Sequence, residues 1–154
     1  MFNIVLHQPE IPPNTGNIIR LCANTGSKLH LIHPLGFVIS EKNLERAALD
    51  YGEGVEIIHH KNFEAFLQNT QLRSYYSVST KGEPMMTDIS IKAGDYLMFG
   101  SETKGLPKGC LTHEKCQKVI RIPMADGSRS LNLSNSVAIV VYYALGQNDF
   151  IGLS

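Results

Sequence analysis

The sequence predicts an α/β fold with a mainly parallel sheet and helices on both faces of that sheet. Short β-like runs recur along the chain, and helix-like segments separate most of them. This alternation is typical of parallel sheets, because the chain must cross over the sheet between neighbouring strands. The chain has 154 residues with 43% hydrophobic content and shows no repeat or linker, so we expect a single domain over residues 1–154.

We expect six strands and four helices. The β-like runs are residues 2–7, 29–32, 55–59, 75–79, 96–99 and 119–122. The helix-like segments are residues 17–24, 41–49, 63–70 and 134–145. Pro107 and Gly109 predict a loop over residues 104–109 rather than a domain boundary.

The first expected helix has two distinct faces. The residues at core-facing helical spacing are Ile18, Leu21, Cys22 and Thr25. Asn17, Arg20 and Asn24 therefore share the opposite face. An arginine between two amides suits a functional site or a partner, and it equally suits a solvated helix face.

The last expected helix is apolar almost all round, from Val137 to Leu145. A helix that covers one sheet needs only one apolar stripe, so a helix that is apolar on every side must be covered on every side. In a chain of this size a second subunit is the natural cover. We therefore expect a homodimer with two-fold symmetry.

Composition excludes several classes of protein. The 14 basic and 14 acidic residues balance, which argues against a protein that coats nucleic acid non-specifically. A cluster of cations between Lys104 and Arg129 suits either a local contact with a folded anion or a solvated loop. No apolar stretch approaches the roughly 20 residues of a membrane span, no secretory signal is read, and the three cysteines are odd in number. We expect a cytoplasmic protein.

Several familiar chemical signatures are missing from the sequence. There is no G-x-G-x-x-G after the first strand, no P-loop and no G-x-S-x-G elbow. Cys110, His113 and Cys116 match no standard zinc spacing, and ordinary packing explains them better. We expect no metal site.

The expected strand ends offer a ligand site instead. Val78, Gly100 and Ile122 each lie at or near the carboxyl end of an expected strand, and a loop of small polar residues follows each of them. Ligands of open α/β sheets bind outside the carboxyl ends of the strands. Such a pocket, floored by backbone and small side chains, suits a planar neutral base such as adenine. Amides at the start of the last helix would also be free to donate.

Three sequence blocks, in this order, resemble the SPOUT superfamily of RNA methyltransferases over nearly all of the chain. They are NTGNIIR at residues 14–20, LMFGSETKGLP at residues 97–107, and IPM at residues 122–124 followed by SLNLSN at residues 130–135. Within the superfamily the chain resembles the minimal single-domain type. That type methylates the ribose 2′-oxygen of the wobble nucleotide in leucine tRNAs.

The resemblance implies a fold feature, a cofactor and a partner. The C-terminal part would form a deep trefoil knot, the methyl donor would be S-adenosyl-L-methionine, and the enzyme would act on tRNA as a homodimer. The residues matching the family's adenosine pocket are Val78, Gly100, Ile122 and Ser130. By the same resemblance Arg20 is tied to activating the ribose hydroxyl, while Asn14, Glu102 and Asn132 shape the site around it. Lys104, Lys108 and Arg129 are the residues we expect to contact tRNA.

Three alternative functions remain open. The same class of enzyme could act on another tRNA position or on rRNA, although no residues are left over for an added RNA-binding domain. A non-catalytic RNA-binding module on this fold is disfavoured because Arg20 and all three blocks are present. A nucleotide-binding dehydrogenase is disfavoured by the missing glycine fingerprint.

Overall fold

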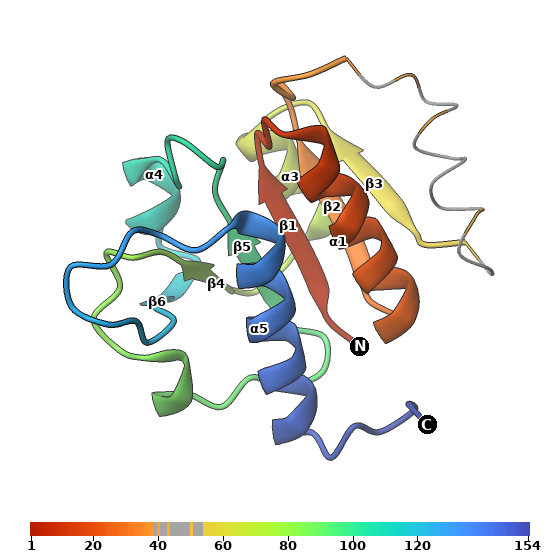
Figure 1. The fold of residues 1–154 in the computed structure, drawn as a ribbon. Helices are drawn as coiled ribbons and strands as arrows, with labels where there is room; N and C mark the ends of the chain where they lie inside the picture. Colours follow the sequence, from red (N-terminus) through yellow and green to blue (C-terminus); the bar gives the residue numbers. More distant parts are fainter. Residues whose placement is uncertain (39, 41–42, 44–49, 51–53) are drawn as a thin grey trace.

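The computed structural model describes residues 1–38, 40, 43, 50 and 54–154 (Figure 1). The helix expected over residues 41–49 lies outside the described residues, apart from Asn43. None of the described helices is both long and apolar enough to cross a bilayer.

A six-stranded sheet forms the centre of the protein, with the strand order β3-β2-β1-β5-β4-β6. Its strands are β1 (Asn3–His7), β2 (Lys28–Ile32), β3 (Ile57–His60), β4 (Tyr75–Val78), β5 (Tyr96–Phe99) and β6 (Cys116–Ile120). Every neighbouring pair is parallel. The carboxyl ends of all six strands therefore lie at one edge, and the predicted α/β fold with a parallel sheet is confirmed.

Two strands differ from the predicted bounds by more than one residue. β3 begins at Ile57, two residues later than expected, and β6 covers Cys116–Ile120 instead of residues 119–122. The apolar run at residues 119–122 marked only the end of β6, because an edge strand pairs on one side only and keeps exposed polar residues such as Lys118. Ile122 consequently lies beyond the strand.

The helices are α1 (Pro12–Thr25), α3 (Phe63–Thr70), α4 (Lys108–Leu111) and α5 (Leu133–Gln147), with a 3-10 turn η1 at Met86–Asp88. α1 begins five residues before the expected start, with prolines at its first positions. Proline is tolerated there because the first amides of a helix have no hydrogen-bond partner within the helix, so the missing N–H costs nothing. The short α4 begins directly after Pro107, so its first two residues fall in the loop expected over residues 104–109. The sequence pattern did not predict this helix.

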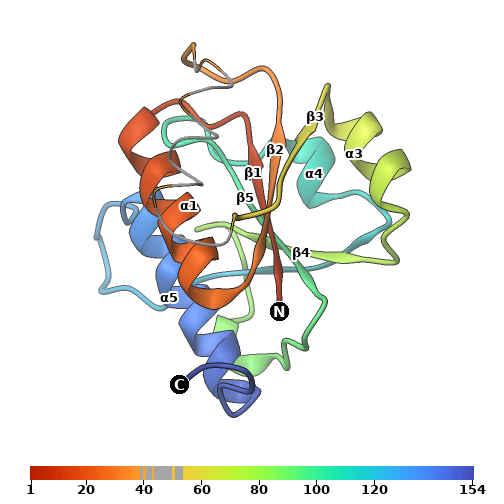
Figure 2. The same cartoon turned by 90° about the vertical axis from the view of Figure 1, so that its right-hand side faces the viewer.

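Helices cover both faces of the sheet, as predicted. α1 and α5 pack side by side on one face, and α3 and α4 lie on the other (Figure 2). The first face carries the larger apolar core, which includes Ile18, Leu97 and Val141. The second holds a smaller cluster around Phe66, Tyr75 and Cys110.

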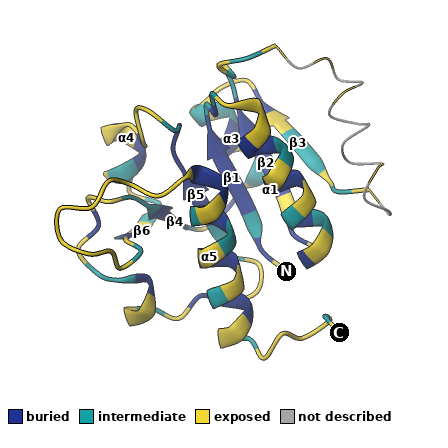
Figure 3. Ribbon diagram, viewed as in Figure 1, coloured by how far each residue is buried: buried dark blue, intermediate teal, exposed yellow. Residues whose placement is uncertain are grey.

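The outer surface of α5 remains partly exposed within one chain (Figure 3). Val137, Val140 and Val141 are fully buried against the sheet, whereas Ile139 is 38% exposed and Tyr142 47% exposed. The helix is thus covered on one side only by its own chain, and the apolar residues on its other side remain the basis for the predicted homodimer.

Candidate functional site

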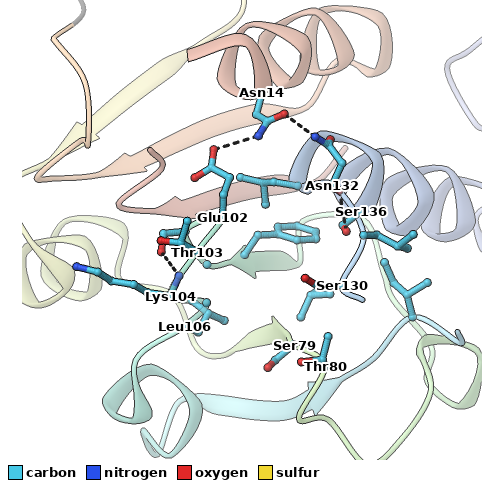
Figure 4. A pocket seen from close by; sticks show the side chains of 18 of the residues that line it. Asn14, Ser79, Thr80, Glu102, Thr103, Lys104, Leu106, Ser130, Asn132 and Ser136 are labelled. Carbon is cyan, nitrogen blue, oxygen red and sulfur yellow. Dashed lines mark hydrogen bonds between the residues drawn. The ribbon is translucent and has the colours of Figure 1, made fainter. Parts of the chain in front are cut away.

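A cavity of about 480 Å³ opens at the carboxyl ends of β4, β5 and β6 (Figure 4). Its walls come from the three loops that follow these strands, from the start of α5 and from the start of α1. The lining residues are 11, 14, 78–81, 99–106, 122, 124, 130–133 and 136. A cavity of this size lies in the range that holds cofactors and other small ligands. The strand-end argument from the sequence therefore located a real cavity.

Gly100 is required by the fold of the loop that follows β5. A Cβ atom at this position would lie 2.2 Å from the carbonyl carbon of Gly105 and 2.4 Å from the amide nitrogen of Leu106. The loop folds back on itself here, with a hydrogen bond from the Gly105 amide to the Ser101 carbonyl, and Gly105 has a positive φ of 65°. The glycine thus shapes one wall of the cavity through backbone packing.

A hydrogen-bonded chain of side chains crosses the rim of the cavity (Figure 4). The Asn14 amide donates to Glu102 Oε1 at 3.2 Å, and the Asn132 amide donates to Asn14 Oδ1 at 3.0 Å. Asn132 Oδ1 in turn accepts from the Ser134 hydroxyl and from the backbone amide of Asn135. The three residues come from the loop after β5, from α1 and from the N-cap of α5, so this network fixes three elements relative to one another.

Glu102 also supplies the cap that α1 lacks. The N-cap residue Ile11 has no side chain that could accept a hydrogen bond. Glu102 Oε1 accepts from the Ile11 amide at 3.0 Å, and Oε2 accepts from the Glu10 amide at 2.7 Å. A carboxylate near a helix N-terminus is stabilising, because it satisfies free amides and opposes the helix dipole.

A second carboxylate, that of Glu10, lies next to this rim, where it is bonded to the lining residue Thr103. Glu10 accepts hydrogen bonds from the Thr103 hydroxyl at 2.7 and 2.8 Å. These bonds, and a further one from Ser101, lower the pKa of Glu10. Glu10 and Glu102 therefore place negative charge on the α1 side of the cavity, which favours a ligand carrying a positive centre.

The walls and the rim of the cavity differ in chemistry. Val78, Phe99, Leu106, Ile122 and Leu133 supply apolar surface, while backbone groups and small hydroxyls supply hydrogen bonds. This combination fits a flat base with a polar edge and a cationic tail, so the residues fit S-adenosyl-L-methionine. Among the described residues, no group of three or more His, Cys, Asp or Glu side chains is arranged to hold a metal ion.

Seven of the eight predicted site residues line this one cavity. They are Asn14, Val78, Gly100, Glu102, Ile122, Ser130 and Asn132. Arg20, the eighth, lies on the exposed face of α1 and does not line the cavity of its own chain. It follows Asn14 by six residues, which is about 9 Å along the helix axis.

Several further residues line the cavity. Ser79, Thr80 and Lys81 follow β4, and Thr103 follows β5, so they belong to the loops expected at the strand ends, although no individual role was predicted for them. Ser136 of α5 also lines the cavity, and no sequence pattern singled it out. Of the expected tRNA contacts, Lys104 lines the cavity, whereas Lys108 and Arg129 are exposed and do not line it.

Comparison with known proteins identifies the family of this chain. The model of the SpoU rRNA Methylase family matches residues 1–142. A tRNA (cytidine(34)-2'-O)-methyltransferase of Saccharophagus degradans is 53% identical over 152 residues, covering 99% of both chains. The protein of that name from Escherichia coli K12 is 51% identical, covering 99% of this chain and 97% of its own.

Solved structures share the same fold. One, described as giving structural insights into the 2-OH methylation of C/U34 on tRNA, superposes with a TM-score of 0.87 and 40% identity, and 97% of each chain is covered. AviRb of Streptomyces viridochromogenes in complex with AdoMet has a TM-score of 0.83 at 22% identity, covering 96% of this chain and 60% of its own, and this likeness shows the fold. With its residues 1–142 matched by the family model and close relatives along its whole length, the chain belongs to the SpoU methylase family.

Proposed function

We propose that this protein is an S-adenosyl-L-methionine-dependent tRNA 2′-O-ribose methyltransferase that acts on the wobble nucleotide, position 34, of leucine tRNAs in the cytoplasm. The observation that carries the proposal is the convergence of Val78, Gly100, Ile122 and Ser130 on one cavity beside the Glu102–Asn14–Asn132 network. Relatives about 50% identical over the full chain are named for methylation of cytidine 34. The leucine isoacceptors follow from the resemblance to the single-domain type.

S-adenosyl-L-methionine, when bound, supplies a methyl group on a positively charged sulfur, which is already activated for displacement. The chain must then bind the adenine and ribose of the donor, exclude water and align the RNA hydroxyl. Val78, Phe99 and Ile122 suit the first task, since they present apolar surface beside open backbone. Alignment of two reactants in a fixed geometry lowers a barrier by about 7–11 kcal/mol in the best cases.

Arg20 is the residue that we assign to the ribose hydroxyl. A guanidinium stays protonated in proteins, so Arg20 acts by stabilising negative charge on the 2′-oxygen and not as a free base. Because it lies about 9 Å along α1 from Asn14, outside the cavity of its own chain, we propose that it serves the cavity of the partner subunit. The site would then be complete only in a homodimer.

Two structural features support the dimer and the knot. Ile139 and Tyr142 leave an apolar surface on α5, and α5 packs beside α1, the helix that carries Arg20. After β6 the chain returns across the sheet to α5, and residues 84–86 pair with Arg121 on the way. We propose that this return passes through a loop of the chain, which forms the trefoil knot.

Nucleoside mass spectrometry tests the reaction. Unmodified tRNA is incubated with the protein and isotopically labelled S-adenosyl-L-methionine, then digested and analysed. We expect labelled 2′-O-methylcytidine or a 2′-O-methylated uridine, mapped to position 34 of leucine tRNAs. Label at another tRNA position, or only in rRNA, would replace the substrate, while no transfer to any RNA would leave the binding-module alternative.

A matched pair of variants tests the assignment of Arg20. Arg20→Ala should lower kcat by about 100-fold or more and leave donor affinity near wild type, as for loss of a group that stabilises developing charge. Asn24→Ala, on the same exposed face of α1, should leave both values unchanged. Loss of donor binding in Arg20→Ala with a normal rate at saturating donor would reverse the assignment.

A further inference from the structure

A second cavity, of about 430 Å³, lies on the sheet away from the first one. Tyr76 of β4 and Lys118 of β6 form its floor and are direct partners in the strand register, so their side chains lie on the same face. Ser90, Lys92 and Asp95 of the segment before β5 supply a wall. Val78 lies two residues beyond Tyr76 on the same face, about 7 Å along the strand, and lines the first cavity.

The Tyr76 phenol is the first sign of a ligand. Tyr76 is only 6% exposed as a residue, and among the described residues its hydroxyl has no hydrogen-bond partner. The hydroxyl is not among the buried unpaired atoms, so it is open to the cavity that Tyr76 lines and can bond to a ligand there. Burial and then the neighbouring Asp95 raise the pKa of Tyr76, so the phenol keeps its proton and is available to donate into the cavity.

The other polar groups of this cavity are mostly donors too. Lys92 and Lys118 contribute two ammonium groups, and Ser90 contributes a hydroxyl. Gln117 accepts from the Ser74 hydroxyl through Oε1, which turns its amide nitrogen toward other acceptors. The single acidic side chain of the lining, Asp95, already accepts from the Lys92 backbone amide through Oδ2. Donors thus outnumber acceptors, and two positive charges face one negative charge.

The wall of the cavity is held in place from behind. The Gln147 side chain accepts from the Ile91 amide at 2.9 Å and donates to the Ile89 carbonyl at 2.8 Å. The Asn148 side chain donates to the Ile91 carbonyl at 2.8 Å. α5 therefore fastens residues 89–91, which places Ser90 and Lys92 before any ligand arrives. Such preorganisation improves affinity, because less ordering is required on binding.

We propose that this cavity is a phosphate-binding site, separate from the methyl-donor cavity. Its donors can bond to the three or four oxygens of a phosphate group. A single carboxylate has only two oxygens and would leave some of these donors without a partner. The volume exceeds that of one phosphate group, so it admits the sugar attached to it. The phosphate belongs either to the backbone of the RNA substrate or to a free phosphate ester, and the RNA source rests on the proposed function.

Titration with inorganic phosphate, followed by protein NMR, tests the shared chemistry without any methyl transfer. We expect saturable shifts of the Ser90, Lys92 and Lys118 amide signals with phosphate, and none with acetate at equal ionic strength. Tyr76→Phe should weaken phosphate binding by about tenfold, the usual worth of a hydrogen bond to a charged group, and leave thermal stability unchanged. None of the residues that the structure describes bonds this hydroxyl. A tyrosine with a purely structural role would therefore not give this pair of results.

Binding of tRNA at several salt concentrations distinguishes the two sources. If RNA supplies the phosphate, Lys118→Ala should reduce the slope of log affinity against log salt by about one. The matched control is Lys61→Ala, an exposed lysine that lines neither cavity, and it should leave the slope unchanged. Phosphate binding with an unchanged slope would assign the site to a free phosphate ester. Absence of saturable phosphate shifts, or equal shifts in wild type and a Lys92→Ala/Lys118→Ala variant, would overturn the proposal. Nucleoside mass spectrometry reports methyl transfer separately, so failure of the proposed function would be recognised on its own.

Discussion

The strands in the two halves of the sheet have their carboxyl ends at the same edge, but different kinds of residue follow them there. In the half formed by β1, β2 and β3, imidazoles stand at or just after the strand ends: His7, His33 and His60. In the half formed by β5, β4 and β6, glycine and small polar residues follow the strands, and the donor cavity opens there. In this protein the donor cavity therefore lies where the residues that follow the strands are small.

Packing of rings closes the first half. His30 and His60 are buried and stacked, with His30 Nδ1 3.0 Å from His60 Nε2, and both rings pack edge-on against Phe66. His7 packs edge-on against Phe63 on the same side of the sheet. Aromatic rings thus fill the space between this half of the sheet and α3.

We expect the largest loss of stability from a substitution at Gly100, where two backbone segments of the open half are in closest contact. Gly100→Ala places a Cβ within 2.2 Å of the Gly105 backbone, so the loop of residues 101–106 must move. We expect unfolding free energy to fall by about 3 kcal/mol and donor binding to be lost. Urea unfolding and calorimetry with S-adenosyl-L-methionine measure the two effects.

Gly109→Ala is the matched control for this change. A Cβ at Gly109 meets nothing within 4 Å, and the residue lies in α4, where alanine is favourable. Stability and donor affinity should stay at or above wild type. A Gly100→Ala protein with normal donor affinity would show that the open half does not depend on this close approach.

The closed half should respond most to acid. Burial, and then the nearby His60, lower the pKa of His30 from 6.5 to about 4. Between pH 6.5 and pH 4, His30 binds a proton in the unfolded chain but stays neutral in the folded chain. Stability is therefore full above pH 6.5 and falls as the pH drops toward 4, by up to about 3 kcal/mol.

Urea unfolding between pH 7.5 and pH 4 measures this loss, with His30→Phe as the comparison. The variant should lose less stability over the same interval, because it has no proton to gain at this position. His60, whose pKa is also lowered mainly by burial, contributes in the same direction in both proteins. Equal acid losses in wild type and His30→Phe would refute the assignment to His30.

Local sequence patterns predicted parts of both halves of the sheet. Local patterns marked β5, α3 and the small residues after each strand, and these determine where the cavity lies. They missed the first turn of α1, because its cap is Glu102, about 90 positions along the chain, and no local pattern can show such a partner. They also misplaced β6, since the polar residues that begin it are paired by tertiary context.

A similar long-range dependence explains the imidazoles. No local sequence pattern links His30 to His60 or His33 to His59. Their pairing across β2 and β3 depends on the strand register, which places Ile32 beside His60 and His30 beside Ile58. Neither the register nor the stacking could be read before the sheet order was known.

Loss of the Glu102 cap should have an intermediate effect. Glu102→Gln keeps the shape of the side chain but turns one acceptor oxygen into a donor that faces a backbone amide. We expect unfolding free energy to fall by about 1–2 kcal/mol and kcat to fall, because α1 and Asn14 lose their anchor. Thr103→Val, which removes only the exposed bond to Glu10, should leave the unfolding midpoint near wild type. Equal midpoints for the two variants would mean that Glu102 does not hold α1.

The smallest effects sharpen the comparison inside the open half, at two adjacent tyrosines of β4. The Tyr75 hydroxyl is buried and donates to the Cys110 carbonyl at 2.6 Å, so it joins β4 to α4. Tyr75→Phe leaves that carbonyl without its partner and should cost about 1 kcal/mol in urea unfolding. Tyr76 points to the other face of the sheet, where no described residue bonds its hydroxyl, so Tyr76→Phe should cost nothing measurable. Equal losses of stability in the two variants would mean that the Tyr76 hydroxyl also has a stabilising partner. The two faces of β4 would then not differ in this respect.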